Sequence, residues 1–493
     1  MKQTVCILLV LALLLCGCGG PGETEQPRTE ADHPEAVFFP VTDALVGDTM
    51  PFFDGGKMNI FFLADQRDGK LGYHPWGLLR TENYWSYEDA GIVLPYGETA
   101  EDQDIALGTG CVIKDQQGTY HAFYTGHNDF REPKETIMHA TSSDMLSWTK
   151  HPEESFTAEE GYSVNDFRDP YVLWAEQDGC WWMLVTGRTP ETGVILRYSS
   201  PDLSKWKFEG VFFADDMGYA TNMECPSLLQ FGGKWYLAFS DQWPDRVVHY
   251  RVSDSMEGPF EKPAQDTVDS NGFYAGRLET DGERLYLVGW NGTKIGHDDL
   301  NDYDWGGSAV VHQLVQAEDG SLRPVANELA VAGTNHSVPL SPKRMTDTVK
   351  AGDGSYTTKG ELYEIVRFEA LERNSRIEAD ISGFGGEGLF GFAFAPDTEN
   401  VGMLSFVFNP KEGRVEFHNT ENLVEDDPQS EMPFDFSKQD KLHATIFIGD
   451  GVACLYLNGE IALTARMYHT QGTDWELFSA NAGVTWENVE VYD

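Results

Sequence analysis

Apolar and polar residues alternate along most of the chain, and glycine-containing turns interrupt this alternation at regular intervals. The segment "YVLWAEQDGCWWMLVTG" shows the unit: a strand, a turn with Gly179, and a second strand rich in aromatic residues. Related segments begin at Pro51, Cys111, Tyr171, Ser227 and Arg277. Their turn glycines lie roughly 50 to 60 residues apart, which is enough for one four-stranded propeller blade per repeat.

The five repeats predict an all-β fold that begins with a five-bladed β-propeller over about residues 41–335. Long stretches with helical periodicity are absent from this region, and glycine supplies the positive φ that tight hairpin turns require. A β-sandwich of similar size is the alternative architecture for the same pattern.

The pattern changes after the stretch "NHSVPLSPKRMTDTVKAGDG". Segments such as "RIEADISGF", "LFGFAFAP" and "KLHATIFIGD" are short alternating strands separated by turns. Strands of this kind at short spacing predict an antiparallel β-sandwich over about residues 350–493.

The N-terminus has the features of a targeting segment. "MKQTVCILLVLALLLCGCGG" places Lys2 before an apolar run that ends in small residues, as a secretory signal does. The run is too short to cross a bilayer comfortably. Its end resembles a bacterial lipobox, with residues 1–18 as the signal peptide and Cys18 as the lipidated first residue of the mature protein. We therefore expect a lipid anchor in the membrane, a bacterial extracytoplasmic or cell-surface location, and a flexible tether over residues 19–40. An ordinary cleaved signal or an anchor helix is the alternative.

The charge balance narrows the choice of partners. The chain has a formal net charge of −45 at pH 7, which argues against nucleic acid, because nucleic-acid binding rewards basic surfaces. A neutral ligand remains compatible with an acidic protein.

Three of the five blades carry a carboxylate about two residues ahead of the expected innermost strand, followed by Pro and at equivalent positions. They are Asp48 in "GDTMP", Asp169 in "FRDP" and Glu224 in "MECP", whereas the other two blades carry "GTGC" and "FYAG". One acidic residue at such a place is usually a turn cap or a solvated side chain. Three at matched positions around one propeller axis predict a shared site, and two close carboxylates are the minimum machinery for cleaving a glycosidic bond.

Aromatic residues near the same end of the blades are candidates for sugar binding. Trp76, Tyr274 and Trp290 would suit the apolar faces of a sugar, although each could equally belong to a blade core.

These residues resemble a known family. "FRDP" and "MECP" are similar in order and spacing to motifs of glycoside hydrolase family 32, the β-fructosidases, and "GTGCVIKDQQGTYHAFYTG" and "FYAGRLETDGERLYLVGW" resemble its second and fifth blades. "WGGSAVVHQLVQAEDGSLRPV" resembles the segment that closes its propeller, and "LYLNGEIALTARMY" a signature of its sandwich domain. The resemblance covers nearly everything from about residue 41 to the end.

The resemblance implies a role for each carboxylate. Asp48 would be the nucleophile and Glu224 the general acid/base of a retaining double displacement on a β-fructofuranosyl unit. Asp169 would hold fructosyl hydroxyls, with Arg168 beside it. The expected partner is a fructose-containing oligo- or polysaccharide, and the mechanism requires neither a metal nor a cofactor.

The chain departs from the family pattern around the first motif. Gly47 stands where the family has an Asn before the nucleophile, and "FFLADQRDGKLGYHPWG" is divergent. Asp65, Arg67 and His74 in this stretch are candidates for sugar contacts; a surface pair of Asp65 with Arg67 is the alternative.

Two other functions compete with a β-fructosidase. The first is another five-bladed-propeller glycosidase of the family 43 type, acting on arabinan or xylan with inversion. The second is a non-catalytic, carbohydrate-binding lipoprotein of the cell surface, which would not need to keep a nucleophile and an acid together.

Overall fold

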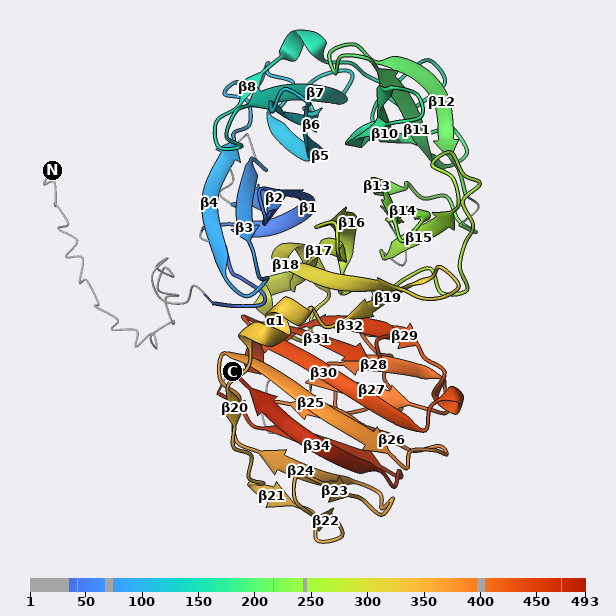
Figure 1. Cartoon of the computed structure of the whole chain (residues 1–493). Helices are drawn as coiled ribbons and strands as arrows, with labels where there is room; N and C mark the ends of the chain where they lie inside the picture. Colours follow the sequence, from blue (N-terminus) through green and yellow to red (C-terminus); the bar gives the residue numbers. More distant parts are fainter. Residues whose placement is uncertain are drawn as a thin grey trace, which may run out of the picture.

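The protein forms two β domains, one beside the other along the long axis of the molecule (Figure 1). The computed structural model describes residues 35–41, 43–66, 74–215, 217–242, 246–396, 404–470 and 472–493. The predicted signal peptide, Cys18, residues 19–34 of the predicted tether and Arg67 lie outside these residues. Within them, no helix is both long enough and apolar enough to cross a membrane.

The first domain is a five-bladed β-propeller, as the repeats predicted, and not a single sandwich. Blade one consists of β1 (Leu45–Asp54), β2 (Lys57–Asp65), β3 (Trp76–Thr81) and β4 (Tyr87–Leu94). Blade two consists of β5 (Ala106–Lys114), β6 (Tyr120–His127), β7 (Glu135–Ser142) and β8 (Thr149–Lys150). Blade three consists of β9 (Arg168–Ala175), β10 (Cys180–Arg188), β11 (Gly193–Ser200) and β12 (Lys207–Phe213).

The last two blades complete the ring. Blade four consists of β13 (Glu224–Phe231), β14 (Lys234–Ser240) and β15 (Val248–Ser253), with isolated bridges beside β15. Blade five consists of β16 (Tyr274–Thr280), β17 (Leu285–Lys294), β18 (Tyr303–Gln316) and β19 (Leu322–Val325). β1 also pairs with β18, at Val46 and Gly307, so the sheets of blades one and five are continuous.

The innermost strands β1, β5, β9, β13 and β16 surround the propeller axis, and each contacts the next around a closed ring (Figure 1). All five carry the same irregularity: two consecutive residues oppose a single residue of the second strand. The bulged pairs are Asp48–Thr49, Gly108–Thr109, Asp169–Pro170, Cys225–Pro226 and Ala275–Gly276. A β-bulge bends its strand and changes the direction of its side chains, and bulges are frequent next to active sites. Five bulges around one axis therefore indicate a candidate functional site at one end of the propeller.

The second domain is an antiparallel β-sandwich, reached through the short helix α1 (Glu328–Gly333). One sheet contains, in order, β22 (Lys350–Ala351), β23 (Tyr356–Thr357), β34 (Thr485–Tyr492), β25 (Asn374–Ser382), β30 (Lys441–Gly449), β31 (Val452–Leu457) and β32 (Ile461–Arg466), with β20 (Ser337–Val338) beside β34. The other contains β21 (Arg344–Met345), β24 (Glu364–Phe368), β33 (Trp475–Ala480), β26 (Leu389–Phe394), β27 (Leu404–Asn409), β28 (Arg414–His418) and β29 (Ser430–Pro433).

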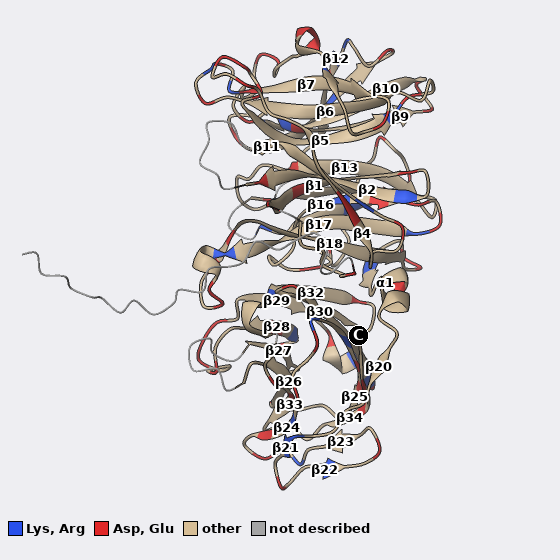
Figure 2. Cartoon of the chain, turned by 90° about the vertical axis from the view of Figure 1, so that its left-hand side faces the viewer, with Lys and Arg blue, Asp and Glu red and all other residues tan. Residues whose placement is uncertain are grey.

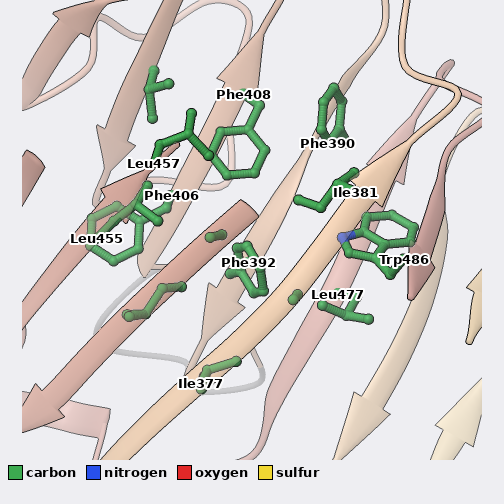
Figure 3. Close-up of a cluster of buried hydrophobic side chains, with 14 of the residues drawn as sticks. Ile377, Ile381, Phe390, Phe392, Phe406, Phe408, Leu455, Leu457, Leu477 and Trp486 are labelled. Atoms are coloured by element: carbon green, nitrogen blue, oxygen red, sulfur yellow. The ribbon is translucent and has the colours of Figure 1, made fainter. Parts of the chain in front are cut away.

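The sandwich is held together by apolar side chains from the inner faces of both sheets. Figure 3 shows Ile377 and Ile381 of β25 opposite Phe390 and Phe392 of β26, all of them buried. The period of two in these strands puts alternate residues into this core. The alternation seen in the sequence is therefore the direct cause of the two-layer packing.

A buried polar cluster joins the two domains. Asp269 of the propeller accepts hydrogen bonds from the backbone N–H of Thr464 (2.9 Å) and from its hydroxyl, and a ring nitrogen of His312 lies 3.0 Å from the same carboxylate. Arg466 donates to the carbonyl oxygen of Asn291 at 2.7 Å. In the side view of Figure 2 the two domains form adjoining layers, and the acidic residues lie mainly on loops and strand edges.

Candidate active site

The three predicted carboxylates lie on three different innermost strands, at the bulges. Asp48 and Asp169 are the first bulged residues of β1 and β9, whereas Glu224 precedes the bulge of β13 and matches Arg168 in register. All three lie within strands and not ahead of them. The prediction of equivalent positions was therefore wrong by one residue for Glu224, because the motifs align as Arg-Asp-Pro with Glu-Cys-Pro.

Side chains of the fifth blade connect two of these carboxylates. The indole N–H of Trp290 donates to Oδ1 of Asp48 at 3.1 Å, and the phenol of Tyr274 lies 2.6 Å from Oε2 of Glu224. The two rings meet edge to face with centroids 6.0 Å apart. Asp48 and Glu224 are thus brought to one site by neighbouring strands of one blade.

Asp48 is a half-buried carboxylate with a donor on each oxygen. Besides the bond from Trp290, Oδ2 accepts a hydrogen bond from the hydroxyl of Thr109 at 2.8 Å. Burial raises the pKa of Asp48, and the two hydrogen bonds oppose this by stabilising the ionised form. The side chain is consequently fixed in orientation, as a nucleophile must be.

Glu224 is held by three donors. Nη2 of Arg168 lies 2.8 Å from Oε1, which also accepts from Nε2 of Gln242 at 2.8 Å. The phenol oxygen of Tyr274 is within hydrogen-bond distance of both Oε2 of Glu224 and the carbonyl oxygen of Asp241, at 2.9 Å. A phenol has one proton, so when Tyr274 donates it to the carbonyl oxygen of Asp241, its oxygen can accept a hydrogen bond from protonated Glu224. The arrangement suits both protonation states of a general acid/base.

Asp169 is the most enclosed of the three carboxylates. Its Oδ2 accepts from the backbone N–H of Cys225 at 3.1 Å, and its own N–H donates to the hydroxyl of Thr125 at 3.0 Å. Burial raises the pKa of Asp169 to about 7; the positive charge of Arg168 opposes the rise and the negative charge of Glu224 adds to it. The residue has φ of +58°, a left-handed conformation that Asp tolerates and that Cys225 and Ala275 share at the matching bulges of β13 and β16.

The predicted aromatic ligands lie in two different environments. Trp76 is fully buried in the first blade and donates its indole N–H to the carbonyl oxygen of Gly108, so the predicted sugar contact is wrong. Tyr274 and Trp290 do lie at the carboxylates, but the guanidinium of Arg246 covers their rings at 4.7 and 5.1 Å. They contact the acidic groups through polar atoms, and the ring faces expected to receive a sugar are occupied.

The divergent stretch after β2 contributes to one side of the site. His74 stacks on Trp305, with ring centroids 4.4 Å apart and 27° between the planes. Burial lowers the pKa of His74, and the charge of Asp65, at the end of β2, opposes this. Their contacts with the predicted sugar stay predictions, and the suggested pairing of Asp65 with Arg67 falls outside the described residues.

Sequence reasoning missed four residues of the site: Thr109, Gln242, Arg246 and Trp305. Thr109 occupies the "GTGC" segment, which was set apart because it has no carboxylate. The repeat itself held the signal, since Thr109 is at the bulge that matches Asp48 and Asp169. Nothing in the local sequence marks Arg246, whose partners come from the next blade.

Comparison with known proteins gives consistent results. The family model "Glycosyl hydrolases family 32 N-terminal domain" matches residues 48–324. A levanbiose-producing levanase from Bacillus subtilis (strain 168) is 23% identical over 401 residues, covering 74% of this chain and 74% of the levanase. A sucrose-6-phosphate hydrolase from Klebsiella pneumoniae is 23% identical over 357 residues, covering 65% of this chain and 74% of that enzyme.

Solved structures show the same fold along nearly the whole chain. The exo-inulinase of Aspergillus awamori superposes with a TM-score of 0.71 at 16% identity, covering 94% of this chain and 98% of the inulinase. A β-fructofuranosidase of Bombyx mori gives 0.69 at 19% identity, with 93% of both chains covered.

Proposed function

The chain belongs to glycosyl hydrolase family 32, and from this premise we propose that it hydrolyses β-fructofuranosyl linkages by a retaining double displacement. The observation that carries the proposal is the link Asp48–Trp290–Tyr274–Glu224, which holds two carboxylates in one site with different hydrogen-bond partners. A pair of carboxyl groups in unlike environments is what the two roles of nucleophile and acid/base require.

In the first step Asp48 attacks the anomeric carbon of the fructosyl unit while Glu224 gives a proton to the leaving oxygen. The negative charge of Asp48 passes into a covalent bond, and the leaving sugar departs as an alcohol. Water then attacks the same carbon with Glu224 as the base, which releases fructose and restores both carboxyl groups. The hydroxyl of Tyr274 can donate to Glu224 while Glu224 is ionised, and can turn to donate to the carbonyl oxygen of Asp241 once Glu224 is protonated.

Asp169 acts on the substrate through hydroxyl groups. Its backbone and one oxygen are already held by Thr125 and Cys225, so the group is rigid. A rigid, enclosed carboxyl group that binds sugar hydroxyls stabilises the substrate geometry without taking part in bond making. Arg168, next to Asp169 on β9, forms an ion pair with Glu224, and this pair fixes the spacing between the strand of Asp169 and the proposed acid/base.

The alternatives have less support. An inverting glycosidase of the family 43 type does not fit the family match. A non-catalytic binding protein would not need Asp48 and Glu224 to retain two and three hydrogen-bond donors respectively. From the N-terminal pattern we also propose that the enzyme is anchored outside the cytoplasm through lipidated Cys18, where it would meet fructans or sucrose-type sugars.

Two substitutions test the mechanism. Asp48→Asn should lower kcat by several orders of magnitude without changing the melting temperature by more than a few degrees, because the side chain keeps its shape and one of its two acceptor oxygens. Glu224→Gln should still form the glycosyl-enzyme from a fructoside with a good leaving group, visible as a burst equal to the enzyme concentration, and then stall unless an external nucleophile such as azide is added. Substantial residual turnover in Asp48→Asn would remove it from the role of nucleophile.

A further inference from the structure

Trp305 occupies the space beside the residue that precedes Asp48. A Cβ atom added to Gly47 would lie 2.3 Å from Cη2 and 2.4 Å from Cζ2 of the Trp305 ring, which is far inside van der Waals contact. Position 47 therefore accepts only glycine while Trp305 keeps this place. The two residues form a complementary pair, brought together by β1 and β18 from opposite ends of the propeller sequence.

The two glycines after Trp305 also allow its ring to lie against β1. Gly306 has φ of +75°, a conformation that strongly favours glycine. A Cβ on Gly307 would lie 1.9 Å from the carbonyl oxygen of Asn291. The segment "WGG" thus needs both glycines to bring its tryptophan against β1.

Trp305 keeps exposed surface beside buried partners. It is half-buried, whereas Trp290, 5.7 Å away between ring centroids, has no exposed surface. Trp290 donates to Asp48, so Trp305 lies one ring removed from that carboxylate. His74, also half-buried, stacks on Trp305 and restricts its ring. A fixed, partly exposed indole next to a carboxylate is suited to pack on the apolar face of a sugar.

We propose that Trp305 is a substrate-contacting residue, which packs against the fructosyl unit bound at Asp48, with His74 holding its ring. The inference rests on the proposed function and adds to it. The pair of Gly47 with Trp305 accounts for the departure of this chain from the expected first motif: the place of a polar side chain before Asp48 is filled by an indole from β18. Recognition on this side of the sugar then depends on packing and not on a hydrogen bond.

The experiment compares Trp305→Ala and Trp305→Phe with Trp148→Ala as the matched control. Trp148 is also half-buried and packs against the same apolar cluster of blades one and two, but its indole N–H donates to the carbonyl oxygen of Met145, away from the site. KM and kcat are measured separately on sucrose and on a long fructan, together with the melting temperature. Gly47→Ala provides a second perturbation, because its methyl group must displace the ring without removing it.

Trp305→Ala should raise KM by about tenfold on both substrates, as loss of one aromatic contact predicts, with a smaller effect on kcat. Trp305→Phe should lie between it and the wild type. Gly47→Ala should raise KM in the same direction, and Trp148→Ala should lower the melting temperature but leave KM unchanged. If Trp305→Ala does not fold, the change in KM of Gly47→Ala and Trp305→Phe decides whether Trp305 contacts the substrate.

Unchanged KM in the folded variants would overturn the inference. A rise confined to the long fructan would also overturn it, because the ring would then contact the leaving chain and not the fructosyl unit. Failure of the proposed function gives a different result. A wild-type enzyme that hydrolyses neither substrate overturns the proposed function and the role of Trp305 together. An active wild type with unaffected variants overturns only the role of Trp305.

Discussion

The hydrogen bond from Thr109 to Asp48 offers a direct test of how the site controls its proposed nucleophile. The Oγ1 of Thr109 lies 2.8 Å from Oδ2 of Asp48, and the Nε1 of Trp290 bonds the other oxygen. Thr109→Val keeps the shape of the side chain and removes only the donor. Because a hydrogen bond stabilises the ionised carboxylate, its loss raises the pKa of Asp48, which burial already raises.

The expected displacement of the acid limb of kcat/KM follows from the type of hydrogen bond that is lost. A hydrogen bond to a charged group contributes about 1.5–3 kcal/mol, and 1.36 kcal/mol corresponds to one pH unit in a titration. The acid limb of kcat/KM should therefore move to higher pH by about one to two units, since free enzyme with protonated Asp48 cannot attack. Above this limb, the activity of Thr109→Val should approach that of the wild type.

Thr49→Val is the matched control for this experiment. Thr49 follows Asp48 on β1, is fully buried, and donates its hydroxyl to the carbonyl oxygen of Val288 at 2.8 Å instead of to a carboxylate. It should lose about 1 kcal/mol of stability without any movement of the acid limb. An acid limb that stays in place in Thr109→Val, or moves equally in Thr49→Val, would refute the assignment of this bond to the nucleophile.

Two further predictions concern other parts of the chain. Hydrogen bonding to Glu378 raises the pKa of His443 in the sandwich to about 9, against 6.5 for an unfolded chain; its contribution to stability is therefore complete below about pH 6.5 and disappears as the pH rises through 9. The melting temperature of His443→Gln should accordingly fall below that of the wild type at pH 6 and match it near pH 10, and a constant difference across that range would contradict the ion pair. In cells, Cys18→Ala should shift the protein out of the membrane fraction and abolish incorporation of labelled palmitate; a variant that stays in the membrane would rule out Cys18 as the lipidated residue.

The architecture could be predicted from the chain because strand periodicity is local. Alternation puts every second residue into a core, and each hairpin carries its own turn glycine, as in the repeat segment that begins at Tyr171. Five such repeats predicted five blades, and the observed strand order excludes the alternative of one sandwich of similar size. The sandwich core around Phe390 and Ile377 follows from the same period of two.

The chemistry of the site was only partly predictable. Asp48, Asp169 and Glu224 were found because a repeat allows residues at corresponding places to be compared. The same comparison gave Glu224 the wrong register, because it matched carboxylates by residue type; alignment of the prolines Pro170 and Pro226 puts Glu224 opposite Arg168. Trp76 and Trp290 are indistinguishable as tryptophans near strand ends, yet one donates to a backbone carbonyl in a blade core and the other to the carboxylate of Asp48.

The sequence by itself determined the β architecture, the number of blades and the identity of the acidic residues, because those depend on short-range periodicity and on residue type. The tertiary structure alone decided what surrounds each acidic residue: Thr109 and Trp290 around Asp48, and Trp305 in the space left by Gly47. These contacts join strands far apart in the chain. Closure of the ring brings β18 against β1, and no local pattern encodes a contact that exists only when the ring is closed.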